Sequence, residues 1–186
     1  MADHLPDIVV TDDVKSVDFD AIIVVSPNIQ SISIAPEVKE PLEKYASVDK
    51  AAEAGVFVVP CDLPAKKIVF SGTGALTNEW DDVRNYAGAA KAGVKKALDT
   101  GSKAPLLYFN VTKYPQADVV SILGALEANY VPLEMREQVP EKAVKLSKLG
   151  ILGDGSKVDL AKALEAGRIV SRDIGGSDPE RMAAPR

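Results

Sequence analysis

The chain alternates between short apolar runs and longer segments that carry apolar residues at helical spacing. Three of the runs are almost continuously apolar, which is typical of strands covered on both faces. Strands are predicted at residues 7–12 (DIVVTD), 20–27 (DAIIVVSP), 31–35 (SISIA), 56–60 (VFVVP), 66–72 (KKIVFSG) and 104–110 (APLLYFN). The segment 143–153 (AVKLSKLGILG) is ambiguous, but its lysines and its glycine at 150 favour an extended edge strand over a helix.

Helices are predicted between these strands, at residues 36–54, 78–99, 116–130 and from Ser156 to the glycine pair at 175 and 176. The strongest pattern is that of 78–99, whose apolar stripe begins at Trp80, so we expect the indole to pack against the sheet. The stripe of the last helix consists of Leu160, Leu164 and Ile174. Strands that alternate with helices in this way predict an α/β fold, a three-layer α/β/α domain with a mostly parallel, mixed sheet.

Composition and charge limit the possible partners. The chain has 186 residues and a net charge of -5, so it forms one domain, or one domain with an appendage, and lacks the basic surface that nucleic acid requires. It has no apolar run of about 18 residues, so no membrane partner is expected. Its one cysteine, Cys61, cannot form an internal disulfide, and the cytoplasm is the expected location.

The same counts restrict the chemistry. With one histidine, His4, and one cysteine, the chain cannot assemble a zinc site of the Cys/His type, and a nucleophile–histidine pair would have to use His4. Several acids near the predicted strand ends are interpreted as solvated turn residues: Asp12, Asp13, Asp18 and Asp20. We therefore predict no catalytic, metal or cofactor-binding residue in this chain.

The segment VFSGTGALTNEW resembles a phosphate-binding loop, with glycines between a strand and a helix. The match is poor, because Thr77 stands where a dinucleotide fingerprint needs its third glycine and no Gly-Lys-Ser/Thr is present. Acids at 79, 81 and 82 would also repel a phosphate. The preferred interpretation is that Gly72 and Gly74 form a tight turn and that Thr77 or Asn78 caps the helix; anion or nucleotide binding is the alternative.

The end of the chain reads SRDIGGSDPERMAAPR. A helix ends at Gly175 and Gly176, and then Asp178, Pro179 and Glu180 have the features of a second helix start: an N-cap residue, proline at the first position and an acid in the first turn. This tail has only one large apolar residue, so we expect residues 177–186 to be mobile unless another domain or molecule holds them.

Two stretches resemble the M17, or leucine aminopeptidase, family. KKIVFSGTGALTNEWDDVRNYAGAAKAGVKKAL is similar to a strand–glycine turn–helix unit of the family's N-terminal domain, and AGRIVSRDIGGSDPERMAAPR is similar to the segment that crosses into its catalytic domain. In the second stretch, Arg172, Asp173, Pro179 and Met182 fit the family pattern. Gly176 and Glu180 stand where better-known members carry asparagines, which indicates an aminopeptidase-like branch and puts typical leucine-releasing activity in question.

The resemblance implies a macro-domain-like fold and a division into residues 1–174, a non-catalytic N-terminal domain, and residues 175–186, a linker to a catalytic domain outside this chain. The parent would be a cytosolic metalloaminopeptidase with two divalent metal ions, zinc or manganese, and would form a homo-oligomer, a hexamer in the family. The partner of this chain would be its own C-terminal catalytic domain, and its role would be assembly and access control. Two alternatives remain: a self-standing macro-like module that binds a small ligand such as a nucleotide or ADP-ribose, and an independent enzyme.

Overall fold

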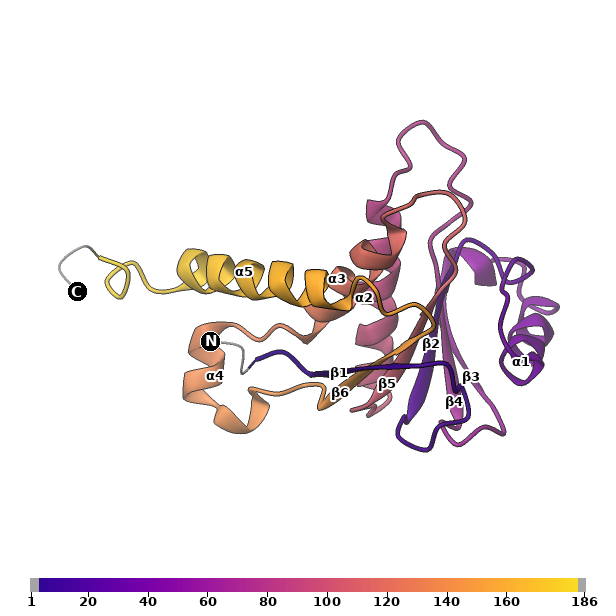
Figure 1. Ribbon diagram of the computed structural model, residues 1–186, viewed down its shortest axis with the longest axis horizontal. Helices are drawn as coiled ribbons and strands as arrows, with labels where there is room; N and C mark the ends of the chain where they lie inside the picture. Colours follow the sequence, from indigo (N-terminus) through magenta and orange to yellow (C-terminus); the bar gives the residue numbers. More distant parts are fainter. Residues whose placement is uncertain (1–3, 184–186) are drawn as a thin grey trace.

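The computed structural model describes residues 4–183 and shows a six-stranded sheet with helices on both faces (Figure 1). The strand order is β1-β6-β5-β2-β4-β3, and neighbouring strands run parallel except that the edge strand β3 is antiparallel to β4. The strands are β1 (Asp7–Thr11), β2 (Ala21–Ser26), β3 (Val56–Pro60), β4 (Lys67–Gly72), β5 (Pro105–Phe109) and β6 (Lys148–Leu152). The predicted mixed, mostly parallel sheet is confirmed.

Two apolar cores lie on the two faces of this sheet, because successive side chains of a strand point to opposite sides. The helices are α1 (Pro36–Ala46), α2 (Arg84–Asp99), α3 (Ala117–Asn129), α4 (Leu133–Gln138) and α5 (Val158–Gly176), with short 3-10 turns η1 (Ala52–Ala54) and η2 (Pro140–Lys142). Ile23 and Val25 of the central strand β2 pack with α2, α3 and α5, whereas Ile22 and Val24 pack with α1. The three-layer α/β/α prediction is therefore confirmed.

Small residues let the α2 helix approach both of its neighbours closely. A Cβ atom added to Gly124 of α3 would lie 2.2 Å from the carbonyl oxygen of Ala87, and one added to Gly93 would lie 2.7 Å from Ile23. Both distances are far below van der Waals contact. The alanine- and glycine-rich composition of this segment is thus explained by close packing of α2 against α3 and the sheet.

The α2 helix begins at Arg84, six residues later than predicted. In the preceding loop, the Asp81 carboxylate accepts a hydrogen bond from the backbone N–H of Asn78 (2.9 Å), and the Asp82 carboxylate accepts one from the N–H of Arg84 (2.8 Å). Such local side-chain bonds compete with helix formation. Trp80 lies in this loop and is 77% exposed, so the predictions that its indole packs on the sheet and that Thr77 or Asn78 caps the helix are wrong.

The segment around β6 is a strand, but it is not at the edge. It lies between β1 and β5 and pairs in parallel with both. Gly150 permits this position, because a Cβ atom there would lie 2.4 Å from the ring of Phe19 and 2.6 Å from Leu106. The glycine therefore reflects close packing in the sheet interior, and the predicted edge position is wrong.

Two further predictions are corrected by local hydrogen bonds. Residues 31–35 form no strand; Ser31 is in a turn in which its N–H donates to Asn28 Oδ1 (2.7 Å). The predicted helix 36–54 is divided, since α1 ends at Ala46 and η1 follows separately. The other predicted strands and the helix at 116–130 are present with boundaries shifted by a few residues.

The α5 helix begins at Val158 and ends at the predicted glycine pair. The Ser156 hydroxyl donates to the Asp154 carboxylate (2.9 Å), and the helix begins two residues later than the predicted start at Ser156. The helix runs away from the sheet toward the end of the chain, with α4 on the same side of the molecule (Figure 1). Within residues 4–183, no helix has the length and apolar character needed to cross a membrane.

Candidate functional site

The carboxyl ends of the parallel strands β2, β4 and β5 meet at one edge of the sheet, where open α/β sheets commonly bind ligands. Here polar side chains join the loops to one another. Asn110 Nδ2 donates to Ser26 Oγ (3.2 Å), Ser31 Oγ (2.9 Å) and the carbonyl oxygen of Ser31 (3.1 Å). The Ser26 hydroxyl donates in turn to the carbonyl oxygen of Asn28 (2.7 Å). These groups satisfy one another and tie the loops after β2 and β5 together.

The glycines at the end of β4 and in the loop after it stand where another residue would clash or be strained. A Cβ atom on Gly72 would lie 1.9 Å from the carbonyl oxygen of Glu53, and Gly74 has a φ of +77°. The nearby cation, Lys113, donates from Nζ to the carbonyl oxygen of Leu76 (2.7 Å). At the start of α2, Arg84 donates to the Asp82 carboxylate and lowers its pKa. An anion would thus meet a carboxylate at this helix start. Gly72 is the last residue of β4 and residues 73–77 form no turn, so the predicted tight turn at Gly72 and Gly74 is wrong.

The two side chains considered for nucleophilic chemistry lie at opposite edges of the sheet. His4 is exposed just before β1, and Cys61 follows β3 directly. Cys61 is half-buried, and burial raises the pKa of its thiol, which disfavours the reactive thiolate. The described chain, residues 4–183, brings no three His, Cys, Asp or Glu residues into an arrangement that could hold a metal ion.

The Arg172 of the family-like motif has a structural contact. It pairs with Glu165 (2.7 Å), whose side chain is completely buried on the inner face of α5. Arg168 also pairs with Glu165 (2.9 Å) and extends to Glu127 of α3 (2.7 Å), which meets Lys91 of α2 (2.6 Å). This network, Lys91–Glu127–Arg168–Glu165–Arg172, joins α2, α3 and α5 through charged side chains.

The neighbouring motif residue, Asp173, fixes the far end of α5. Its carboxylate accepts hydrogen bonds from the Tyr130 hydroxyl (2.9 Å) and from the buried guanidinium of Arg136 in α4 (2.5 Å). Arg172 lies over the Tyr130 ring, 5.1 Å from its centroid. Arg172 and Asp173 of the motif therefore anchor the α5 helix.

The opposite face of α5 is apolar and exposed. Leu160 is 50%, Leu164 46% and Ile174 56% exposed. We call these three residues the α5 outer face. They form the apolar stripe predicted for this helix, but the buried side of the helix is formed by Val158, Ala161, Glu165 and Ile169. The predicted stripe exists, yet residues 4–183 leave its side chains about half exposed.

Beyond α5, residues 177–183 form a turn rather than a helix. Asp178 Oδ1 accepts from the N–H of Glu180 (2.7 Å), and the N–H of Asp178 donates to Glu134 of α4 (2.9 Å). Arg181 pairs with Glu137 (2.7 Å). Met182 is 43% exposed. Residues 184–186, the last part of the predicted tail, lie outside the described residues, and the mobility of residues 177–186 stays a prediction.

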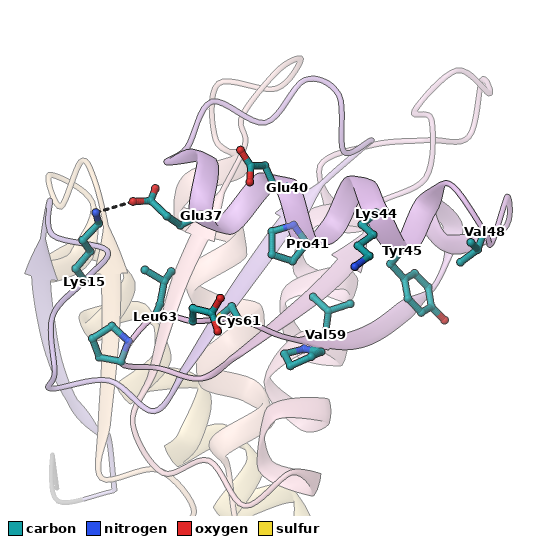
Figure 2. A pocket seen from close by; sticks show the side chains of 13 residues that line it. Lys15, Glu37, Glu40, Pro41, Lys44, Tyr45, Val48, Val59, Cys61 and Leu63 are labelled. Atoms are coloured by element: carbon teal, nitrogen blue, oxygen red, sulfur yellow. Dashed lines mark hydrogen bonds and ion pairs between the residues drawn. The ribbon is translucent and has the colours of Figure 1, made fainter.

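A groove of about 1010 Å³ lies on the other side of the molecule, between α1 and the end of β3 (Figure 2). Its apolar lining comes from both walls and consists of Pro41, Tyr45, Val48, Val59, Pro60, Leu63 and Pro64, together with Cys61. Tyr45 is held in place by stacking on Phe57, with ring centroids 4.2 Å apart. Sequence patterns did not reveal this groove; the proline-bounded VVPCDLPA stretch is the one local signal of it.

The charges of the groove are unevenly paired. At one end, Lys15 and Glu37 form an ion pair (2.6 Å) that raises the pKa of the lysine and lowers that of the glutamate (Figure 2). The remaining charged side chains, Glu40, Asp62 and Lys44, form no ion pair with the described residues. Two acids thus face one base, and the unpaired part of the groove is negative.

Comparison with known proteins gives the family context. No family model matches the chain. A Caenorhabditis elegans protein named "Putative aminopeptidase" is 36% identical over 184 aligned residues, which cover 90% of this chain and 35% of that protein. The chain therefore spans about a third of the length of this relative.

Solved structures show the same fold. A mutant of tomato leucine aminopeptidase superposes with a TM-score of 0.64 and 16% sequence identity, and the match covers 91% of this chain and 38% of the tomato protein's chain. A macrodomain mutant from Oceanobacillus iheyensis superposes with a TM-score of 0.57 and 13% sequence identity, and the match covers 88% of this chain and 92% of the macrodomain's chain. The resemblance stated from the sequence is confirmed: the chain is a homologue of an aminopeptidase-like protein and has the macrodomain-like fold that is also present in leucine aminopeptidase.

Proposed function

We propose that this chain is the non-catalytic N-terminal domain of a cytosolic, leucyl-type metalloaminopeptidase, and that it serves assembly and access control. Residues 1–174 would form the domain, and 175–186 would lead into the catalytic domain. The proposal is supported by the homologue, of which this chain spans 35%. The observation that carries it is the α5 outer face, an apolar surface on the last helix that residues 4–183 leave about half exposed.

The two faces of α5 explain why this surface suits docking. The charged network and the Asp173 contacts fix the helix on its inner side, so the outer face is presented without further ordering. Full burial of one large apolar side chain contributes about 1.5–3 kcal/mol, so three half-exposed side chains would each add about 1 kcal/mol on docking. A second domain of the same polypeptide can use such a modest surface, because it is held at high effective concentration.

The catalytic chemistry would belong to the rest of the parent. Two metal ions, zinc or manganese, would clamp the attacking water and polarise the scissile carbonyl. Residues 4–183 contain no fitting ligand group, so no catalytic step is assigned to this chain. We further propose a homo-oligomeric parent, a hexamer, in which this domain restricts access to the active sites; this follows from the family resemblance.

The test compares this chain with the longer parent protein. Peptidase activity is measured with leucyl-anilide plus manganese or zinc, and assembly is measured by sedimentation. We expect activity and assembly in the parent and no activity in this chain. Turnover by this chain would contradict the non-catalytic role, and an inactive parent with intact assembly would contradict the aminopeptidase assignment.

The docking surface is tested separately by a double substitution, Leu164→Glu with Ile174→Glu. The control is Val144→Glu, at an exposed apolar residue (59%) outside α5. In this chain all three changes should alter the free energy of unfolding by less than about 0.5 kcal/mol, as at ordinary surface positions. In the parent, the double substitution should impair assembly or lower activity about tenfold or more, whereas the control should not. Unchanged assembly and activity would show that the α5 outer face is not the docking surface.

The macrodomain likeness keeps the small-ligand alternative testable. Calorimetric titration of this chain with ADP-ribose and with ATP addresses it directly. We expect no binding up to about 1 mM, because Asn110 and its partners already occupy the space between the loops after β2 and β5. Micromolar binding would favour the alternative.

A further inference from the structure

The edge strand β3 carries unpaired backbone groups beside the groove. The N–H of Cys61 donates to the carbonyl oxygen of Lys66, and the N–H of Gly72 donates to that of Gly55, so residues 55 and 61 face β4. Because N–H and C=O groups alternate in direction along an antiparallel strand, Val56, Val58 and Pro60 direct theirs outward. No backbone hydrogen bond from Val56 or Val58 to another loop or element is present among the described residues. This edge can therefore accept a further strand.

The groove is long enough for a short extended segment. The α1 wall runs from Glu37 to Tyr45, eight residue steps, which is about 12 Å at the helical rise of about 1.5 Å per residue. An extended chain covers that length with about four residues. A strand added to β3 would direct every second side chain toward the α1 side of the sheet, over the apolar lining at Tyr45, Val48 and Val59.

We infer that this groove binds an extended peptide segment, which adds to the free edge of β3 and inserts alternate apolar side chains between β3 and α1. Main-chain hydrogen bonds to Val56 and Val58 would supply affinity that does not depend on sequence, and the apolar lining would select the side chains. Pro60 has no N–H group, so the added strand loses a donor there, and pairing is confined to the first part of β3.

Charge defines the segment further. Glu40 and Asp62 are unpaired acids, and Lys44 is the one unpaired base in the lining. The segment should therefore carry basic rather than acidic residues between its apolar ones. This inference does not depend on the aminopeptidase assignment, because it uses only the edge strand, the lining and its charges.

The test uses three labelled, acetylated octapeptides: one that alternates valine with lysine, one that alternates valine with glutamate, and the lysine peptide with alternate backbone amides N-methylated. Binding to this chain is followed by fluorescence anisotropy, and the site is located by amide shifts in NMR spectra. We expect the lysine peptide to bind, with the largest shifts at the Val56 and Val58 amides. The affinity of the glutamate peptide and that of the N-methylated peptide should each be lower than that of the lysine peptide by a factor of about ten or more.

Two variants locate the contacts. Val58→Pro removes an outward N–H without touching the ladder to β4, and Val48→Ser removes an apolar side chain at the exposed (82%) edge of the lining without changing its charge. Val58→Pro should weaken binding of the lysine peptide about tenfold, and Val48→Ser should weaken it by a similar factor through loss of an apolar contact. Val144→Ser is the matched control and should leave binding unchanged. Circular dichroism and the unfolding midpoint show that each variant is folded.

Several outcomes would overturn the inference. They are failure of the lysine peptide to bind at about 1 mM, equal binding of the N-methylated peptide, and shifts confined to residues away from β3 and α1. Self-association of the chain that Val58→Pro abolishes would show that the edge pairs with a second copy of the chain instead of a peptide.

Discussion

The α2 and α5 helices pack against the same core, yet they place their apolar residues differently. The α2 helix buries its stripe completely between α3 and the sheet, including Tyr86 and Val94. The α5 helix buries a glutamate, Glu165, on its inner face and exposes Leu160, Leu164 and Ile174. An apolar stripe therefore predicts that a helix has one apolar face, but it does not predict that the described residues bury that face.

The largest effect is expected where α2 meets the core. Tyr86 is completely buried, and its hydroxyl donates to the carbonyl oxygen of Asn110 (3.1 Å). Tyr86→Ala should cost about 3–5 kcal/mol of unfolding free energy, measured by urea denaturation, because it leaves a large cavity. Trp80→Ala is the matched control and should cost less than about 1 kcal/mol, since that ring is 77% exposed. A large effect at Trp80 would show that the loop before α2 packs inward.

The next effect concerns the charged inner face of α5. Glu165→Ala leaves Arg168 and Arg172 without their shared carboxylate. Loss of one partner from a buried ion pair costs about 3–5 kcal/mol, and we expect about 3 kcal/mol here because both arginines are partly exposed. Glu40→Ala, at an exposed acid without an ion pair, should change stability by less than about 0.5 kcal/mol. Equal effects of the two changes would show that the network does not hold α5.

A pair of glycine substitutions compares the two helices directly. Gly124→Ala would force a methyl group against the backbone of Ala87 and should destabilise the chain by about 1–3 kcal/mol. Gly167, on α5, has nothing within 4 Å of an added Cβ. Gly167→Ala should therefore stabilise the chain by up to about 1 kcal/mol through its helix propensity. Thermal unfolding of both variants measures the difference, and a destabilising Gly167→Ala would indicate a close neighbour that the structure lacks.

The smallest expected effect is a pH dependence of stability that comes from the ion pairs of Glu127 with Lys91 and Arg168. Lys91 donates to Glu127 and, together with Arg168, holds the pKa of this carboxyl below its ordinary value of 4.5. A lowered folded-state pKa contributes stability that is present above the unfolded value and is lost as the pH falls through the folded one. We expect Glu127→Gln to lessen the loss of stability between about pH 5 and pH 3. Identical acid profiles of the two proteins would show that the pairing contributes no stability.

Local patterns in the sequence were sufficient to predict the six strands of the sheet, but they also predicted a strand at 31–35 that is absent and an edge position for β6 that is wrong. The run AIIVVS of β2 is buried at every residue, as a continuous apolar run between two covered faces must be. The lack of a second histidine or cysteine was likewise evident from composition. The motif residues Arg172 and Asp173 indicated the family, although their contacts with Glu165, Tyr130 and Arg136 could not be foreseen, because the partners lie up to 43 residues away.

The tertiary structure decided the placement of those residues whose contacts are distant in sequence. The sequence determined that 143–153 contains a strand and that 158–176 is a helix with an apolar stripe, because periodicity is a local property. It did not determine that Phe19 and Leu106 enclose Gly150 in the sheet interior, or that buried charge directs Leu160 and Leu164 outward. The groove beside β3 is likewise formed by α1 and a loop whose packing no local pattern specifies. Apolar periodicity is set by the residues themselves, whereas the surface that it covers is chosen by the free energy of the whole packed chain.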